Sequence, residues 1–357
     1  MYPRITADLN KLRHNARFIA DACHAAGIHY AAVTKGVCAS QPIVAALEDI
    51  ADSFADSRLL NLQHMQTRKP KLMLRIGDPA QAEQLVAAAD LSLQSELVTL
   101  QALARAAQAL QRPHQVVLMV DLGDLREGLM YTDRGAILAA ARLVKDSPPL
   151  SLHGLGVNLT CFGGILPDEE NLGRLLDIAR WLRRELDLPI PLISGGNSSS
   201  VGLMLRGGMP KGINHLRIGE AVLLNNDTAI GEPFDFLHQN VFTLSAALGE
   251  VQQKPSQPFG ASGPNAFGEH VSFPDLGPMR RGILLLGRQD ADLEGLRPRD
   301  PRIKVLGGSS DHLLVDLTAA PEYAVGDAVH FGVSYGCLLK AYTSPYIAKT
   351  YTPPQGE

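Results

Sequence analysis

Two patterns of apolar residues, one typical of buried strands and one of helices, alternate along residues 8–224. Short apolar runs that suit buried strands are each followed by a stretch whose apolar residues recur at helical spacing. The strand-like runs cover residues 30–35, 53–57, 71–76, 91–95, 115–123, 152–159, 191–197 and 215–224. Eight strand–helix steps over this length predict an α/β fold in which parallel strands close into a (β/α)8 barrel.

The pattern changes after about residue 231. Helical spacing fades, and proline and glycine cluster in the stretch 254–268. The strand-like runs here cover residues 241–251, 281–287, 303–310, 312–318 and 328–336. Short strands separated by turn residues predict a mainly antiparallel β domain. We therefore expect a barrel domain over residues 8–230 and a β-rich domain over residues 231–357, with residues 1–7 able to add a strand.

Composition narrows the class of protein. The 357 residues are 45% hydrophobic and 20% charged, with a formal net charge of −4, which is ordinary for a globular protein. No basic run points to nucleic acid, and no apolar run is long enough to cross a bilayer or to form the core of a signal peptide. A soluble cytoplasmic protein with neither nucleic acid nor membrane as a partner is therefore expected.

The four cysteines, Cys23, Cys38, Cys161 and Cys337, show no CxxC spacing. A disulfide framework or a structural zinc site is therefore not expected, and we predict no metal. Buried thiols are the simplest interpretation for Cys23 and Cys337. Cys38 and Cys161 fall near the segments considered next.

The first predicted strand ends in a lysine, in the stretch "HYAAVTKGVCAS". Burying an ammonium group is costly unless it is paired or loses its proton. One interpretation is that Lys35 only extends its head out of the barrel mouth. The other is that desolvation lowers its pKa, so that the amine can act as a nucleophile or form a Schiff base at the barrel end where active sites lie.

Two glycine-rich loops favour the second interpretation. "SGGNSSS" (194–200) follows the seventh strand, and "LRIGEAVL" (216–223) follows the eighth. Loops at these two places are the usual phosphate site of a barrel, and glycine lets backbone N–H groups approach an anion closely. A lysine after strand one together with this cradle suggests pyridoxal 5′-phosphate bound to Lys35.

With these motifs in order, the chain resembles the alanine-racemase-type (fold type III) pyridoxal-phosphate enzymes, and within them the ornithine racemase branch. The stretches that carry the resemblance are "AAVTKGVCA", "GLGVNLTCFGG", "ISGGNSSS", "MPKGINHLRIGEAVLL", "NAFGE", "LGRQD" and "GGSSDHLLVDLT". They occur in order over nearly the whole chain. The resemblance implies a homodimeric racemase with shared active sites.

The resemblance also implies a set of cofactor-binding residues. They are Lys35 for the aldimine, Ser198, Gly219 with Glu220, and Tyr335 for the phosphate, Arg217 for the pyridine nitrogen, Arg126 near the cofactor oxygen and substrate carboxylate, and Asn158 beside the ring. A guanidinium donates a hydrogen bond to the ring nitrogen without protonating it. Because an unprotonated ring is the weaker electron sink, Arg217 favours racemisation over decarboxylation.

The second acid/base needed to invert Cα departs from the pattern. Arg288, in "GRQDAD", stands where alanine racemases have a catalytic tyrosine, and Ala39 replaces a tyrosine near the lysine. In related ornithine decarboxylases the loop matching "GGSSDHLL" supplies a catalytic cysteine and an aspartate that holds the distal amine of the substrate. Ser310 and Asp311 match this pair, so we expect Asp311 to bind the distal ammonium of ornithine.

His312, whose ordinary pKa lies near neutrality, is a candidate second base. A packed or surface histidine is the competing interpretation for it, and Arg288 or Asp290 could instead bind a carboxylate or an amine.

The sequence therefore predicts a racemase for ornithine or another basic amino acid. Three alternatives remain open at this point: a decarboxylase of a diamino acid, a pyridoxal-phosphate-binding protein without turnover, and a barrel hydrolase without a cofactor.

Overall fold

The computed structural model describes residues 2–264, 267–268 and 270–353. The chain folds into two compact units. One spans Asn10–Gln239, and the other combines Met1–Leu9 with Asn240–Glu357. The sequence pattern had put the boundaries at residues 8 and 230, so the first unit runs nine residues further than expected at its carboxyl end.

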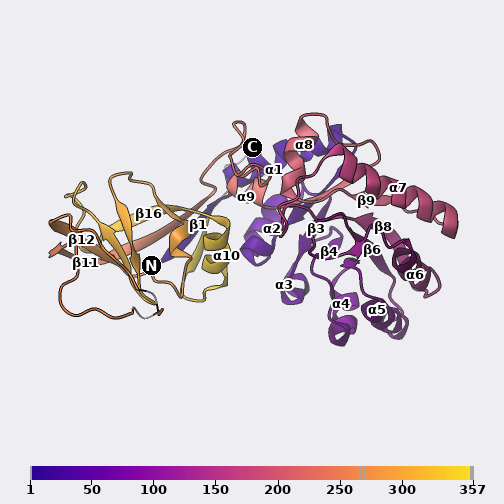
Figure 1. Cartoon of the computed structure of the whole chain (residues 1–357), viewed down its shortest axis with the longest axis horizontal. Coiled ribbons are helices and arrows are strands. Elements are labelled where there is room, and N and C mark those ends of the chain that lie inside the picture. Colours follow the sequence, from indigo (N-terminus) through magenta and orange to yellow (C-terminus); the bar gives the residue numbers. More distant parts are fainter. Residues whose placement is uncertain (1, 265–266, 269, 354–357) are drawn as a thin grey trace. The chain divides into compact units, whose positions relative to one another are not determined.

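Parallel strands close into a barrel in the first unit (Figure 1). Counted over the described residues, its strands are β2 (His29–Val33), β3 (Ser53–Asp56), β4 (Lys71–Met73), β5 (Leu91–Gln94), β6 (His114–Asp121), β8 (Leu150–Gly156), β9 (Leu192–Ser194) and β10 (His215–Ile218). Pairing of β5 with β6 closes the ring. The eight-step barrel predicted from the pattern is confirmed. A short strand, β7 (Leu129–Met130), pairs with β6 outside this ring.

Side chains of alternate residues fill the barrel. Leu91 and Leu93 of β5 and Val117 and Met119 of β6 belong to one buried cluster with small residues such as Ala31 of β2. This two-residue spacing places one face of each strand toward the interior. The barrel is therefore a packed core, and binding chemistry has to lie at its ends.

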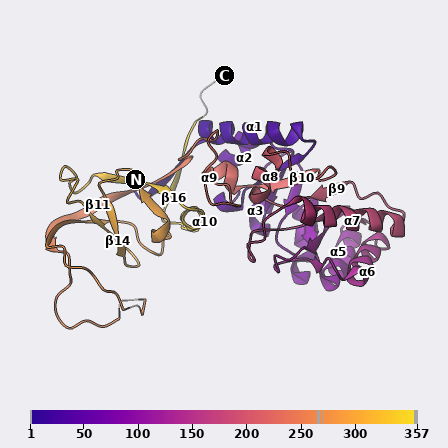
Figure 2. The ribbon, with the colours of Figure 1, turned by 45° about the horizontal axis from the view of Figure 1, so that its top comes forward.

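Helices surround the strands. They are α1 (Leu9–Ala25), α2 (Gln41–Leu47), α3 (Leu59–His64), α4 (Ala82–Ala88), α5 (Leu97–Ala109), α6 (Arg134–Lys145), α7 (Glu169–Leu186), α8 (Val201–Leu205) and α9 (Glu220–Leu224). Figure 2 shows α1, α5, α6 and α7 along the outside of this unit. α7 begins with a capping box in which Asp168 and Asn171 exchange hydrogen bonds. No helix of the described chain is long and apolar enough to cross a membrane.

The second unit is built on a mainly antiparallel sheet. Its strands are β1 (Arg4–Asp8), β11 (Phe242–Pro255), β12 (Pro278–Leu284), β13 (Leu296–Pro298), β14 (Lys304–Gly308), β15 (Leu313–Asp316), β16 (Ala328–Val333) and β17 (Ala348–Thr352). β1 pairs antiparallel with β11 and parallel with β17, so a strand from each end of the chain meets in this sheet.

One local expectation in this unit is wrong. The run 328–336 was predicted as a continuous strand, but β16 ends at Val333 and helix α10 (Tyr335–Thr343) starts two residues later. The hydroxyl of Ser334 accepts a hydrogen bond from the backbone N–H of Cys337 and caps the helix. Tyr335 is therefore the first residue of a helix.

Candidate active site

Lys35 lies directly beyond the carboxyl end of β2, where it opens a 3-10 turn (Lys35–Val37). Burial lowers the pKa of its amine. Among the charged neighbours, Arg126 and Arg217 lower this pKa further, whereas Cys161 and Asp56 raise it. The amine is therefore easier to deprotonate than an exposed lysine.

A buried carboxylate fixes the residue before the lysine. Asp56 ends β3 and is fully buried, and its Oδ2 accepts a 2.8 Å hydrogen bond from the hydroxyl of Thr34. Its Oδ1 accepts from Asn61 Nδ2 at 3.0 Å and from the backbone N–H of Arg58 at 2.9 Å. Burial raises the pKa of Asp56, against the effect of these hydrogen bonds. Asp56 thus anchors the turn that carries Lys35.

Arg217 projects from β10 and is 3% exposed. Its guanidinium donates to the hydroxyl of Ser194 and, at 2.7 Å, to the carbonyl oxygen of Val157. Ser194 also bonds Nδ1 of His215 at 2.7 Å. Arginine can only donate, so the hydroxyl oxygen of Ser194 accepts a hydrogen bond from Arg217. The hydroxyl proton of Ser194 is then donated to Nδ1 of a neutral His215.

Burial lowers the pKa of Arg217 to about 10, so the guanidinium stays charged at neutral pH. Burial also lowers the pKa of His215, to about 3, with Arg217 lowering it further. Neutral His215 and Ser194 thus hold a charged guanidinium in place without adding a second charge beside it.

The two glycine-rich loops are joined by hydrogen bonds. The hydroxyl of Ser198 accepts from the backbone N–H of Gly219 at 3.3 Å and of Ala221 at 3.2 Å. A Cβ on Gly219 would lie 2.9 Å from Cβ of Val33, so only glycine fits beside β2. Burial raises the pKa of Glu220, whose carboxylate accepts from Asn226, while Lys35 lowers it.

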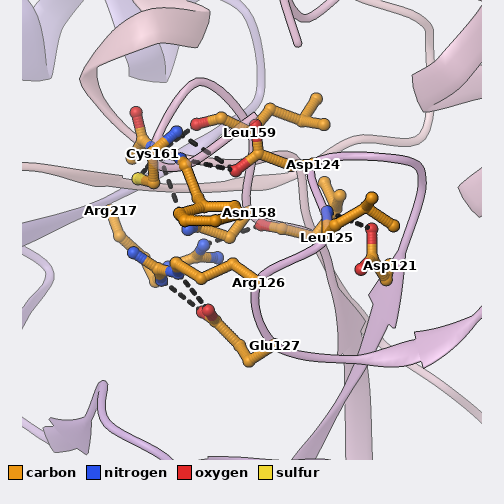
Figure 3. A network of polar contacts seen from close by, with 12 residues as sticks. Asp121, Asp124, Leu125, Arg126, Glu127, Asn158, Leu159, Cys161 and Arg217 are labelled. Atoms are coloured by element: carbon orange, nitrogen blue, oxygen red, sulfur yellow. Dashed lines mark hydrogen bonds and ion pairs between the residues drawn. The ribbon is translucent and has the colours of Figure 1, made fainter. Parts of the chain in front are cut away.

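Arg126 and Asn158 stand together at the carboxyl ends of β6 and β8 (Figure 3). Arg126 forms an ion pair with Glu127. The Asn158 amide lies 2.5–3.0 Å from the three guanidinium nitrogens when its oxygen faces them, and 2.9 Å from Nδ2 of Asn197 on its other side. Both neighbours are donors, so the single oxygen of Asn158 can serve only one of them at a time.

The C-terminal unit brings a second set of predicted residues together. The turn after β12 and the turn between β14 and β15 are joined, because the backbone N–H of Arg288 donates to the carbonyl oxygen of Ser309 at 2.9 Å. Asp311 is exposed, and its carboxylate accepts from Gln289 Nε2 at 2.6 Å and from the hydroxyl of Ser310 at 2.8 Å. A Cβ on Gly287 would meet the backbone of Ser310 at 2.0 Å, so this glycine is needed for the close approach.

The remaining C-terminal predictions divide by burial. His312 is exposed next to Asp311. Asp290 is 6% exposed, and its two oxygens accept from Gly287 N and from the hydroxyl of Ser344. Asp290 therefore supports the turn. Tyr335 is half-buried at the start of α10.

Residues 7–226 match the family described as "Alanine racemase, N-terminal domain". The chain belongs to the alanine racemase family. Members of this family use pyridoxal 5′-phosphate, and the resemblance inferred from the motifs is confirmed.

Two relatives of this family match the chain along its length. The chain is 45% identical to "Ornithine racemase" of Acetoanaerobium sticklandii over 98% of this chain and 99% of that protein. It is 34% identical to "Lysine racemase" of Thermotoga maritima over 99% of each. Among solved structures, an alanine racemase from Streptomyces coelicolor A3(2) covers 98% of this chain and 97% of its own, at 20% identity and a TM-score of 0.73. That likeness supports the fold.

Three groups that support the predicted residues could not be predicted from the motifs. They are Asp56 beneath Lys35, the Ser194–His215 pair behind Arg217, and Gln289 beside Asp311. Asp56 and Ser194 are the last residues of β3 and β9, so their position at strand ends was an available signal. No such signal marked Gln289, because its hydrogen bond to Asp311 depends on two turns that meet only in the folded structure.

Proposed function

We propose that this chain is a pyridoxal-phosphate-dependent racemase of basic amino acids, with ornithine or lysine as substrate. Membership of the family and full-length identity to two racemases named for these amino acids support the proposal. The observation that carries it is the position of Lys35, which is buried beyond the end of β2 and lies close enough to Arg126 and Arg217 for both to lower its pKa.

The residues present fit the cofactor. Lys35 supplies the amine that would hold it. The hydroxyl of Ser198, which accepts from the backbone N–H groups of Gly219 and Ala221, would donate its proton to the phosphate. The hydroxyl of Ser199 is buried and has no hydrogen-bond partner within the described chain, which a phosphate oxygen would provide. When bound, the cofactor withdraws electrons from the substrate Cα and so makes the α-proton acidic.

The residues around the ring nitrogen favour racemisation. Arg217 would donate a hydrogen bond there, and its pKa near 10 keeps the proton on the guanidinium. Its hydrogen bonds run to Ser194 and Val157, neither of which carries a charge. This arrangement restrains the build-up of negative charge on the ring, and we therefore prefer a racemase to a decarboxylase.

Proton transfer at Cα needs a group on each face. Lys35 Nζ takes or returns the proton on one face, helped by its lowered pKa. We assign the opposite face to His312, and the substrate carboxylate to Arg126, which Asn158 contacts. Tyr335 is proposed to reach the phosphate.

The test of this function is exchange at Cα. L-Ornithine in heavy water should gain deuterium at Cα and yield D-ornithine without release of carbon dioxide, and Lys35→Ala should abolish both. Carbon dioxide release, or exchange that survives Lys35→Ala, would contradict the proposal.

Substrate choice is assigned to Asp311. Gln289 and Ser310 orient its carboxylate, and an ammonium group would form a charge-assisted hydrogen bond with it. Asp311→Ala should raise the KM for ornithine on the order of tenfold or more and leave the KM for alanine nearly unchanged. Asp275→Ala, which removes another exposed carboxylate of this unit, is the matched control. Equal losses for both substrates would contradict this role.

We propose a homodimer in which each site is completed by the C-terminal unit of the other copy. Exposed apolar side chains on loops at the carboxyl end of the barrel support an interface there: Leu125 is 65% exposed and Phe162 is 76% exposed. Mixing inactive Lys35→Ala with Asp311→Ala protein should restore part of the activity at ornithine concentrations too low for Asp311→Ala alone, because mixed dimers contain one site with both residues. Sites built within one copy would give no recovery.

A further inference from the structure

Two loops at the carboxyl end of the barrel carry the residues proposed to meet the substrate. The loop after β6 (122–128) holds Arg126, and the loop after β8 (157–165) holds Asn158 and Cys161. Neither loop is fixed by strand pairing where these side chains lie. Something else has to hold Arg126 and Asn158 against each other.

Besides the direct contact of Asn158 with Arg126, one carboxylate joins the two loops. Asp124 is 1% exposed. Its Oδ2 accepts from the backbone N–H of Cys161 at 3.2 Å and of Phe162 at 3.0 Å, and its Oδ1 accepts from the N–H of Ile165 at 3.2 Å. Its own carbonyl oxygen accepts a fourth bond, from Gly163 at 3.1 Å.

The second loop is shaped around this carboxylate. A Cβ on Gly163 would lie 2.8 Å from the carbonyl oxygen of Asp124, so glycine is required for the approach. Thr160 takes a left-handed backbone conformation (φ 64°), and its hydroxyl closes the loop by donating to the carbonyl oxygen of Ile165 at 2.9 Å. The N–H groups thus converge on Asp124 (Figure 3).

Asp121, three residues earlier, shows the contrast. Its Oδ1 accepts from the backbone N–H of Gly123 and Leu125, both in its own loop. Asp121 therefore shapes one loop, whereas Asp124 ties two loops together. Both residues are aspartates near the carboxyl end of β6, but of the two only Asp124 bonds the loop after β8.

We propose that Asp124 is a positioning residue whose carboxylate locks the loop 160–165 onto the loop after β6 and so sets where Asn158 stands relative to Arg126. The consequence for catalysis rests on the proposed function, whereas the lock itself does not. Asp124→Ala leaves three N–H groups without their acceptor, and the loop opens. Asp124→Asn keeps one acceptor oxygen and should retain part of the lock.

Hydrogen exchange on the cofactor-free protein tests the lock directly. In Asp124→Ala, amides 161–165 should exchange faster on the order of tenfold or more, with a smaller change in Asp124→Asn. Asp133→Asn is the matched control, because Asp133 caps α6 and asparagine caps equally well. Unchanged exchange at 161–165 in both Asp124 variants would overturn the proposal, whatever their activity.

Kinetics tests the consequence. A residue that only stabilises the fold changes the amount of active protein, and so the apparent kcat, but not KM. A displaced Arg126 should raise KM for the amino acid, and kcat/KM should fall by up to about 10²-fold in Asp124→Ala, with an intermediate value in Asp124→Asn. A lowered kcat with KM unchanged in both variants would overturn the positioning role. If the natural chain shows no racemase activity, the exchange measurement still decides whether the lock exists.

Discussion

At the scale of single residues, the proton affinity of Lys35 is set by opposing neighbours. Burial lowers the pKa of Lys35, and Asp56 is one of the groups that raise it. Asp56→Asn should therefore lower the pKa of Lys35 further and increase the neutral, reactive fraction of the amine at a given pH.

Reductive methylation of the cofactor-free protein, followed at the Lys35 peptide by mass spectrometry across pH, checks this expectation. The pH midpoint for methylation of Lys35 should lie below that of an exposed lysine in the natural protein, and should move to lower pH in Asp56→Asn. Lys304, exposed on β14, serves as an internal reference for the reagent. A midpoint that moves to higher pH would contradict the assigned effect of Asp56.

How far the sequence reveals such residues depends on where they lie. Lys35 was recognisable because a charged residue at the end of an apolar strand contradicts the pattern around it, whereas the role of Arg217 came from the resemblance. Ser310 and Asp311 came from resemblance alone, since nothing in "GGSSDHLL" separates a ligand from a polar turn. Asp124 went unnoticed because its partners lie nearly forty positions further along the chain.

At the scale of elements, strand spacing in the barrel depends on two glycines of β8. A Cβ on Gly154 would lie 2.3 Å from the carbonyl oxygen of Leu192 in β9, and one on Gly156 would lie 2.9 Å from the sulfur of Met119 in β6. Backbone atoms cannot yield as a flexible side chain does. The pairing of β8 with β9 therefore requires glycine at position 154.

Gly154→Ala should lower the free energy of unfolding by roughly 1–3 kcal/mol. Gly173→Ala is the matched substitution: this glycine lies within α7, and its Cβ would meet no atom within 4 Å. It should stabilise the protein by about 0.5–1 kcal/mol. Denaturant unfolding of the two variants measures both effects. Equal free energies of unfolding in the two variants would contradict the requirement for glycine at position 154.

Local periodicity explains which elements could be predicted. The barrel strands and their helices stood out because the period switches with each step. β17 did not, because it is a strand through its pairing with β1, which is distant in the sequence. α10 was missed as well, since its first residues were assigned to the preceding strand-like run.

At the scale of the whole molecule, two buried histidines link stability to pH. Burial lowers the pKa of His114 to about 4 and of His215 to about 3. In the unfolded chain each binds a proton near pH 6.5, so acid favours unfolding as the pH falls from 6.5 toward these lower values.

The expected loss is about 2 kcal/mol per histidine at pH 5. Urea unfolding at pH 7 and pH 5 should show this fall, and His114→Gln should remove roughly half of it, since glutamine does not titrate. His114 lies in the barrel strand β6, bonded to Ser92 at 2.8 Å, so the test leaves the Lys35 site untouched. A pH response that His114→Gln leaves unaltered would assign the effect to other groups.

The parallel pair of β1 and β17 also orders events during synthesis. The ribosome makes Arg4–Asp8 long before Ala348–Thr352, so β1 must wait through the translation of the barrel for its second neighbour. The barrel, encoded between them, can assemble meanwhile. A nascent chain halted after residue 239 would therefore contain every barrel strand, and a strand β1 whose two partners, β11 and β17, had not yet been made.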